Sequence, residues 1–266
     1  MDLAFQNKNV LVTGASGGIG QSIARTFSDE QANVIAHYHS NSQSANQLVS
    51  ELKKPAWALP ANLCDEAQVT NLFSQADAKA GPVHVLVANA GIWPPDHTPI
   101  QEMSVEQWQN TIDTNLKSVF LCCREFIRQV ERHQISDPAI VMIGSTAGEF
   151  GEAGHADYAA TKSAMIKGMT LSLKNEIVRV AARGRVNTVS PGWVMTPMAE
   201  KFASDPQAIN WALSTIALRK VASPQDIANA VVFLSSSQVA GHITGQTITV
   251  SGGMEGRRLF REDELS

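Results

Sequence analysis

The stretch that decides the fold is Val10-Leu11-Val12-Thr13-Gly14-Ala15-Ser16-Gly17-Gly18-Ile19-Gly20, in which a short apolar run meets a glycine-rich turn. A pattern of helical period begins directly after it. Such a turn needs glycines because the backbone bends tightly and lets a pyrophosphate approach without Cβ atoms in the way. The following helix N-terminus offers free N–H groups and a partial positive charge to phosphate oxygens. The stretch therefore predicts a strand, a phosphate-binding turn and a helix, with an ordinary glycine-rich turn as the alternative.

The same alternation continues along the chain. Short runs rich in Val and Ile, most of them followed by a segment of helical period, lie at 10–12, 34–36, 56–61, 83–88, 139–143, 186–189 and 247–250. Nearly continuous apolarity is typical of strands buried on both faces, as in parallel sheets covered by helices. The sequence predicts an α/β fold: a single doubly wound, Rossmann-type domain with a mostly parallel seven-stranded sheet and helices on both faces. We expect helices to begin at Ser104-Val105-Glu106 and at Ser223-Pro224.

The composition excludes several classes of protein. The 266 residues carry a net charge of -4, which gives no long-range attraction for nucleic-acid phosphates. The three cysteines are too few for a disulfide framework and indicate reduced thiols. No apolar run approaches the ~20 residues that span a bilayer, and the N-terminus has no signal-peptide pattern. We therefore expect a cytoplasmic protein that binds neither nucleic acid nor membrane.

No repeat or linker divides the chain, so we expect one domain over residues 1–254. The end of the sequence, 255–266, is rich in charge and is expected to be a tail that is solvated or contacts another subunit. Only 17% of the residues are charged, against about 25% in average soluble domains. This leaves two interpretations open, a surface covered by other subunits or compositional drift.

Further motifs follow the glycine turn, whose spacing is G-x-x-x-G-x-G. In order, they are Asn89-Ala90-Gly91, Asn115 within Thr114-Asn115-Leu116-Lys117-Ser118-Val119-Phe120, Ser145 after an apolar run, Tyr158-Ala159-Ala160-Thr161-Lys162, and Ser190-Pro191-Gly192-Trp193-Val194-Met195-Thr196. A Tyr-x-x-x-Lys pair alone is weak, but the joint order is specific. Over roughly residues 8 to 254 the chain resembles the short-chain dehydrogenase/reductase family.

The resemblance implies a catalytic tetrad. Tyr158 would be the proton donor, Lys162 its electrostatic partner and a ribose ligand, and Ser145 a hydrogen-bond donor to the substrate oxygen. Asn115 would hold a water that connects Lys162 to solvent. Without the resemblance, simpler interpretations are a surface Tyr–Lys pair, a serine that caps a helix, and a polar break in a helix.

The spacing of Tyr158 and Lys162 suits acid–base catalysis by a tyrosine. At positions i and i+4 of a helix, Tyr158 and Lys162 lie one turn apart on the same face. A phenol with a pKa of about 10 is a poor acid–base catalyst at neutral pH. We expect the nearby ammonium to favour the phenolate and to lower the pKa of Tyr158 toward the working range.

The resemblance also implies a nicotinamide cofactor, NADP(H) being favoured and NAD(H) possible. Tyr38 stands where NAD-binding folds commonly carry an acid, so no carboxylate repels a 2′-phosphate, and His39, Ser40 and Asn41 can donate hydrogen bonds to it. Against this, Gly17 stands where many NADPH-preferring relatives have a basic residue. The expected cofactor contacts are Gly14, Ser16, Gly17, Gly18, Ile19, Gly20, Tyr38, His39, Ser40, Asn62, Leu63, Asn89, Ala90, Gly91, Tyr158, Lys162, Pro191, Gly192, Val194 and Thr196.

Large apolar side chains near the reactive centre indicate a hydrophobic pocket for a ketone or secondary alcohol. The expected substrate contacts are Ser145, Tyr158, Trp93, Phe150, Trp193 and Met198, and residues 197 to 217 are expected to form a lid. No histidine pairs with Cys, Asp or Glu at a metal-ligand spacing, so no metal is predicted. His155 lies close to Tyr158 in sequence, so it either reaches the mouth of the site or, as the favoured interpretation, lies at the surface.

The leading hypothesis is an NAD(P)(H)-dependent oxidoreductase that interconverts a ketone and a secondary alcohol, with Tyr158 as general acid and base. The stretches Gly241-His242-Ile243-Thr244-Gly245-Gln246 and Ser251-Gly252-Gly253 resemble 3-oxoacyl-[acyl-carrier-protein] reductases, which makes that activity the named alternative. An acidic chain offers no obvious basic dock for an acidic carrier protein. A nucleotide-binding sensor without turnover is the rival from another class. The resemblance further implies a homotetramer.

Overall fold

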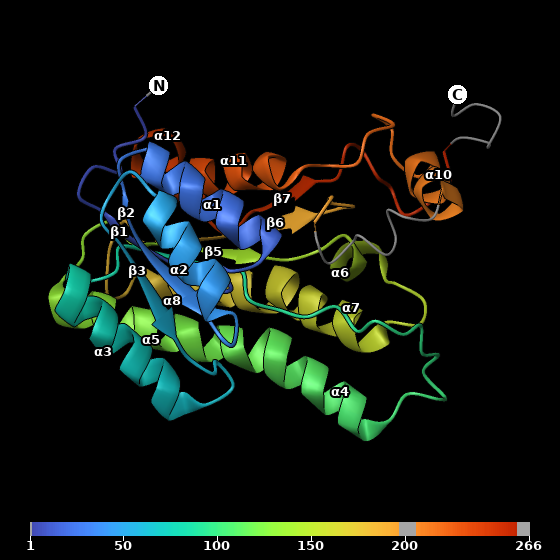
Figure 1. Cartoon of the computed structure of the whole chain (residues 1–266), viewed down its shortest axis with the longest axis horizontal. Helices are drawn as coiled ribbons and strands as arrows, with labels where there is room; N and C mark the ends of the chain where they lie inside the picture. The colour runs from blue at the N-terminus through green and yellow to red at the C-terminus, as the bar shows by residue number, and fades with distance from the viewer. Residues whose placement is uncertain (1, 197–205, 260–266) are drawn as a thin grey trace.

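The computed structural model describes residues 2–196 and 206–259, and within them the seven strands form one sheet that is parallel throughout (Figure 1). The strand order is β3-β2-β1-β4-β5-β6-β7. This confirms the predicted α/β fold. The strands are β1 (Asn9–Val12), β2 (Asn33–Tyr38), β3 (Ala56–Pro60), β4 (Val85–Ala88), β5 (Ala139–Ile143), β6 (Arg185–Pro191) and β7 (Thr247–Val250).

The sheet is buried on both faces because successive side chains of a strand point in opposite directions. In β1, Leu11 packs into one hydrophobic cluster, while Val10 and Val12 pack into the other. Val and Ile side chains fill both faces of the sheet. This explains why the apolar runs in the sequence are nearly continuous and do not alternate with polar residues.

Helices cover both faces of the sheet (Figure 1). One cluster takes side chains from α1 (Gly18–Asp29), α2 (Ser42–Glu51) and α11 (Pro224–Ser235). The other takes side chains from α3 (Glu66–Ala80), α5 (Ser118–His133) and α8 (Thr170–Ile177). Among the described residues, none of the helices is long and apolar enough to cross a membrane.

Both predicted helix starts are confirmed. Helix α4 (Val105–Ile112) begins after Ser104, whose Oγ accepts a hydrogen bond from the Gln107 amide at 3.0 Å. Helix α11 begins with Pro224 after Ser223, and Ser223 and Asp226 cap each other's backbone amides. These caps satisfy N–H groups that the first helical turn leaves without a partner.

Two long helices change pitch near the centre of the molecule. Helix α4 continues through the π-helix η1 (Asp113–Lys117) into α5, and α7 (Ala156–Ser163) continues through the π-helix η2 (Ala164–Met169) into α8. Single π turns are frequent at functional sites because they re-aim the side chains of a helix. The remaining short helices are α6 (Ala147–Phe150), α10 (Pro206–Ser214) and α12 (Ser237–Ala240).

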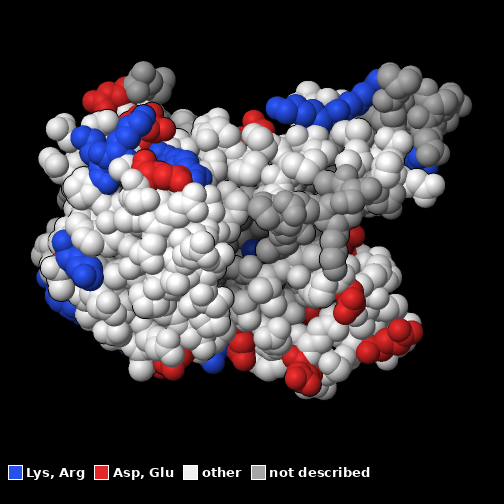
Figure 2. Space-filling model, in the orientation of Figure 1, with Lys and Arg blue, Asp and Glu red and all other residues white. Residues whose placement is uncertain are grey.

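The strand order creates a switch point between β1 and β4. From β1 the chain winds outward through β2 and β3, then crosses back to place β4 on the other side of β1. Connections leave in opposite directions at this point, which opens a crevice at the carboxyl ends of the strands, where α/β folds bind ligands. Figure 2, in the same orientation, shows a hollow over this part of the surface.

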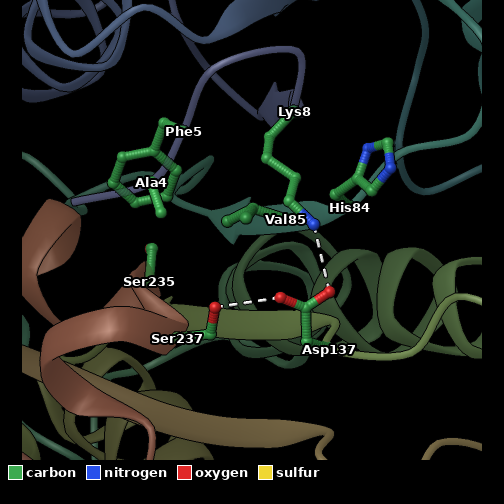
Figure 3. A pocket seen from close by; sticks show the side chains of 8 residues that line it. All are labelled: Ala4, Phe5, Lys8, His84, Val85, Asp137, Ser235 and Ser237. Carbon is green, nitrogen blue, oxygen red and sulfur yellow. Dashed lines mark hydrogen bonds and ion pairs between the residues drawn. The ribbon is translucent and has the colours of Figure 1, made fainter. Parts of the chain in front are cut away.

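The opposite edge of the sheet holds a small pocket (Figure 3) of about 10 Å³, lined in part by Phe5, Lys8, His84 and Asp137. Lys8 Nζ lies 3.0 Å from Asp137 Oδ1, and Ser237 Oγ donates to Asp137 Oδ2 at 2.9 Å. Burial alone would raise the pKa of Asp137, but these hydrogen bonds outweigh it and lower the pKa. The pocket has room for at most about one water. Through Asp137, the contacts of Lys8 and Ser237 connect the N-terminal segment to α12.

Candidate active site

The glycine turn after β1 is packed tightly on one side and open on the other. Gly14 has a φ of 64°, a left-handed conformation that favours glycine. A Cβ on Gly20 would collide with the Gly14 carbonyl oxygen and lie 2.8 Å from Ala15 Cα. Gly17 is the N-cap of α1 and brings no capping side chain, and a Cβ there would meet only the Gly14 oxygen, at 3.5 Å. The open helix N-terminus beside this turn fits the pyrophosphate of a dinucleotide.

The segment after β4 is fastened to this turn. Thr13 Oγ1 accepts hydrogen bonds from the amides of Asn89 at 2.9 Å and Ala90 at 3.0 Å. In return, Asn89 Nδ2 donates to the Thr13 carbonyl at 2.9 Å. The predicted contacts Asn89, Ala90 and Gly91 therefore stand beside the glycine turn, across the switch point.

The predicted adenosine contacts lie at the ends of β2 and β3. Tyr38 is half-buried, while His39 and Ser40 are exposed and lead into α2, which Asn41 caps by accepting from the Ser44 amide at 3.0 Å. Asn62 Oδ1 accepts from the Cys64 amide at 3.0 Å. An amide oxygen has a second lone pair, so this oxygen can still accept a bond from an adenine amino group. Leu63 follows Asn62 and is buried.

Ser145 and Tyr158 meet at the carboxyl end of β5. Ser145 Oγ accepts from the Ala147 amide at 3.2 Å, so the serine caps α6, and it also forms a hydrogen bond with the Tyr158 side chain. The capping interpretation and the catalytic one are thus compatible. Tyr158 stands on the first turn of α7, facing the strand end that carries Ser145.

Lys162 lies one helical turn further on and is buried. Its Nζ donates to the Ile143 carbonyl at 2.8 Å and lies 5.5 Å from the centroid of the Tyr158 ring. Burial lowers the pKa of Lys162 to about 8. The Lys162 ammonium group therefore lies within reach of the Tyr158 ring.

The expected shift of Tyr158 is wrong in direction. Burial raises its pKa to about 12, the Ser145 hydrogen bond acts in the opposite direction, and the charge of Glu152 raises it further. The physical reason is that burial penalises the phenolate more than the neighbouring groups favour it. In this structure Tyr158 keeps its proton at neutral pH.

Asn115 sits inside the π-helix η1 and is completely buried. Its Oδ1 accepts from the Ile92 amide at 2.7 Å and its Nδ2 donates to the Ile92 carbonyl at 2.9 Å. A Cβ on Gly91 would lie 3.0 Å from Asn115 Oδ1 and 3.6 Å from Lys162 Nζ. The helix is therefore widened at Asn115 but not broken, and the asparagine lies close to Lys162. The water relay stays a prediction.

Aromatic rings gather beside Tyr158, where substrate contacts are expected. Trp93 stacks on His155, with ring centroids 4.0 Å apart, and presents its edge to Tyr158 at 4.7 Å. The surface placement expected for His155 is wrong: its ring is buried by this stack, and its Nε2 donates to the Pro94 carbonyl at 3.2 Å. Trp93 thus packs against the Tyr158 ring, and its role as a substrate contact stays a prediction.

The other predicted substrate contacts are more scattered. Trp193 packs against Trp211 of α10 in a T-shaped arrangement, with ring centroids 5.9 Å apart. It lies in the segment after β6 with Gly192, Val194 and Thr196, and Pro191 is the last residue of β6. Phe150, at the end of α6, is 46% exposed, and its ring lies where a Cβ on Gly256 would collide with it. Met198 lies outside the described residues. Of the expected lid, residues 206–214 form α10, with Ala212 buried.

One buried carboxylate at the site has no counterpart in the sequence motifs. Asp157 accepts hydrogen bonds from the Tyr158 amide at 2.8 Å, Thr111 Oγ1 at 2.8 Å and Gln107 Nε2 at 3.3 Å. It is fully buried and ties α7, which carries Tyr158, to α4. The only signal in the sequence is an acid in the first turn of a helix, a common and unspecific preference.

No metal site accompanies these groups in the part of the chain that the structure describes: it contains no cluster of three or more His, Cys, Asp or Glu that could hold an ion.

The comparisons with known proteins agree with this geometry. Residues 14–255 match the family model described as enoyl-(acyl carrier protein) reductase. The 3-oxoacyl-[acyl-carrier-protein] reductase FabG of Staphylococcus epidermidis is 38% identical over 252 residues, covering 93% of this chain and 99% of that protein. FabG of Escherichia coli strain K12 is 37% identical, covering 94% and 98%.

A solved structure is similar over the same extent. The short-chain dehydrogenase/reductase of Brucella melitensis described as a glucose/ribitol dehydrogenase has a TM-score of 0.86 and 29% identity, covering 96% of this chain and 99% of its own. Sequence and fold are thus similar to those of these proteins over nearly the whole length. The chain belongs to the short-chain dehydrogenase/reductase family.

Proposed function

We propose that this oxidoreductase interconverts a ketone and a secondary alcohol and prefers NADP(H). The observation that carries the proposal is the meeting of Ser145, Tyr158 and Lys162 at the carboxyl edge of the sheet, beside an open glycine turn. When bound, the nicotinamide group would supply or accept the hydride.

The side chains have separable roles in this reaction. Tyr158, which keeps its proton at neutral pH, donates it to the carbonyl oxygen as that oxygen gains charge. Ser145 donates a hydrogen bond to the same oxygen and stabilises the developing charge. Lys162, held by the Ile143 carbonyl, stabilises the phenolate left behind. Asn115 would hold the water through which the proton is replaced.

The preference for NADP(H) rests on the residues after β2. Tyr38, His39 and Ser40 bring no carboxylate to the ribose, and the N-terminus of α2 follows directly. The guanidinium of Arg25 already donates to Glu51 Oε2 at 2.8 Å and to Gln21 Oε1 at 3.0 Å, so we do not assign it to the 2′-phosphate. Hydroxyl, imidazole and backbone N–H groups would therefore bind a 2′-phosphate, and NAD(H) would bind more weakly.

A 3-oxoacyl thioester on a carrier protein is the second candidate, favoured by the FabG relatives. Although the chain is acidic overall, Arg219, Lys220, Arg257 and Arg258 are exposed on two segments joined by a hydrogen bond from the Leu218 amide to the Gly252 carbonyl at 2.9 Å. Figure 2 shows basic side chains gathered on this side of the molecule. Arg257 is paired with Glu255 at 2.7 Å and Lys220 lies 3.7 Å from Asp226, so the cluster keeps a small excess of positive charge, which suits an acidic partner.

We also propose a cytoplasmic homotetramer. The exposed apolar side chains Phe120, Leu171 and Val178 and the low charged fraction support surfaces buried between subunits. Analytical ultracentrifugation tests this, and a monomeric species at working concentration would contradict it.

The decisive experiment is a panel of ketones, secondary alcohols and 3-oxoacyl thioesters, run with NADPH and NADH in parallel. Turnover of simple ketones with NADPH supports the first candidate, and a strong preference for the thioesters supports the second. Tyr158→Phe should abolish turnover while the variant still binds NADPH. A wild-type protein that binds NADPH but turns over nothing in the panel would be a nucleotide sensor.

A further inference from the structure

His37 occupies a buried position between the two halves of the expected adenosine site. It is the penultimate residue of β2, and its side chain is 2% exposed. Both ring nitrogens contact the backbone of other segments: the Gly14 amide donates to Nδ1 at 3.0 Å, and Nε2 lies 3.0 Å from the Ala61 carbonyl. The His37 carbonyl also accepts from the Ala15 amide at 2.8 Å.

These partners fix the proton on the ring. A backbone N–H only donates, so Nδ1 must be the acceptor; a carbonyl only accepts, so Nε2 must carry the proton. The neutral ring thus satisfies a donor and an acceptor at once. Burial, together with the charge of His39, outweighs the Ala61 hydrogen bond and lowers the pKa of His37 to about 4, which preserves this state in neutral solution.

The two backbone groups held by the ring belong to different parts of the nucleotide site. Gly14 opens the glycine turn at the end of β1. Ala61 directly precedes Asn62 and Leu63, the expected adenine contacts after β3. The ring therefore sets the spacing between the phosphate-binding turn and the adenine-binding loop.

We propose that His37 is a positioning residue that aligns the glycine turn with the loop at 62–63 for the adenosine half of a dinucleotide. The inference rests on the proposed function, since it requires that the chain bind NADPH. His37 acts through Gly14 and Ala61 and does not itself touch the ligand.

A second histidine provides a matched control. His84 Nδ1 accepts from the amide of Asn9, the first residue of β1, at 3.1 Å, at the opposite edge of the sheet. Both histidines thus bind a backbone N–H at an end of β1, but only His37 stands at the edge where nucleotides bind. His84 is only partly buried, so the packing that its ring contributes is smaller than at His37.

The test measures the dissociation constants of NADPH and of 2′,5′-ADP, a probe of the adenosine half, for the full-length protein. We expect His37→Leu to weaken both by about tenfold or more, the equivalent of one lost hydrogen bond, while His84→Leu leaves both nearly unchanged. His37→Asn keeps an acceptor near the Nδ1 position and His37→Gln keeps a donor near the Nε2 position, so each should bind between wild type and His37→Leu. In steady-state turnover, KM for NADPH should rise while kcat at saturation stays.

The possible failures are distinguishable. If the wild type binds neither NADPH nor NADH, the proposed function fails and this inference with it. If the wild type binds but His37→Leu binds equally well, only the role of His37 is overturned. If His37→Leu does not fold, the Asn and Gln variants decide: wild-type affinity in both, with lower thermal stability, would show that His37 serves the fold alone.

Discussion

Replacing Asp157 should separate the placement of Tyr158 from its chemistry. Asp157 is fully buried between α7 and α4, and its carboxylate accepts two short hydrogen bonds, from the Tyr158 amide and Thr111 Oγ1, and a longer one from Gln107 Nε2. A hydrogen bond to a charged group contributes about 1.5–3 kcal/mol. Thr111 Oγ1 also lies 3.1 Å from the Gln107 carbonyl and can turn to it, which reduces the loss.

Asp157→Ala should therefore destabilise the fold by about 2–4 kcal/mol. Because the Tyr158 amide loses its anchor, the phenol also moves, and a displacement of about 1 Å costs up to ~100-fold in kcat. Asp157→Asn should behave differently. Its oxygen can keep the Tyr158 amide, while the Gln107 amide and the Thr111 hydroxyl can both turn to accept from its nitrogen.

Urea denaturation gives the free energy of unfolding, and kcat at saturating substrate and NADPH gives the catalytic effect. We expect Asp157→Asn to have a free energy of unfolding and a kcat close to those of the wild type. Asp157→Ala should lower both quantities, while its dissociation constant for NADPH stays unchanged. The reasoning is refuted if Asp157→Ala is as active as wild type, or if the Asn variant is as impaired as the Ala variant.

Three further predictions follow from the glycine turn and from His37. Gly20→Ala should destabilise the fold by about 1–3 kcal/mol, because its Cβ meets backbone atoms, whereas Gly17→Ala meets only an ordinary contact and should lose little; thermal melts compare the two. Gly17→Arg should raise the preference for NADPH over NADH by about tenfold, since a guanidinium reaches the 2′-phosphate; an unchanged ratio of the two dissociation constants would contradict this. Folding lowers the pKa of His37 from 6.5 to about 4. Between pH 6.5 and 4, His37 is therefore protonated in the unfolded chain but still neutral in the folded protein. The free energy of unfolding should fall by about 3 kcal/mol from this group as pH drops from 6.5 to 4, and urea titrations of His37→Leu should show a shallower dependence.

The sequence predicted what depends on local pattern and spacing. The glycine turn, the Val- and Ile-rich strands and the caps at Ser104 and Ser223 follow from short-range chemistry, and each matches the structure. The parallel order of the strands then brings Ser145 to the same edge as the glycine turn.

What the sequence could not predict depends on contacts between distant residues. Asp157 meets Thr111 across 46 positions, and His37 meets Ala61 across 24. Neither contact leaves a periodic signal, because a single buried polar residue looks the same in sequence whether it is paired or exposed. The same limit explains His155, whose burial follows from the loop that carries Trp93 and Pro94.

Burial acts on both members of the Tyr158–Lys162 pair and bears on the direction of the proposed reaction. Burial favours the neutral form of both groups of the pair, so it raises the pKa of Tyr158 to about 12 and lowers that of Lys162 to about 8. At neutral pH the phenol then carries the proton that carbonyl reduction requires, while alcohol oxidation must first remove it. In the proposed reaction Lys162, still largely protonated at pH 7, would stabilise the phenolate once reduction has formed it. In the proposed function, the burial of this pair would therefore favour carbonyl reduction over alcohol oxidation near neutral pH.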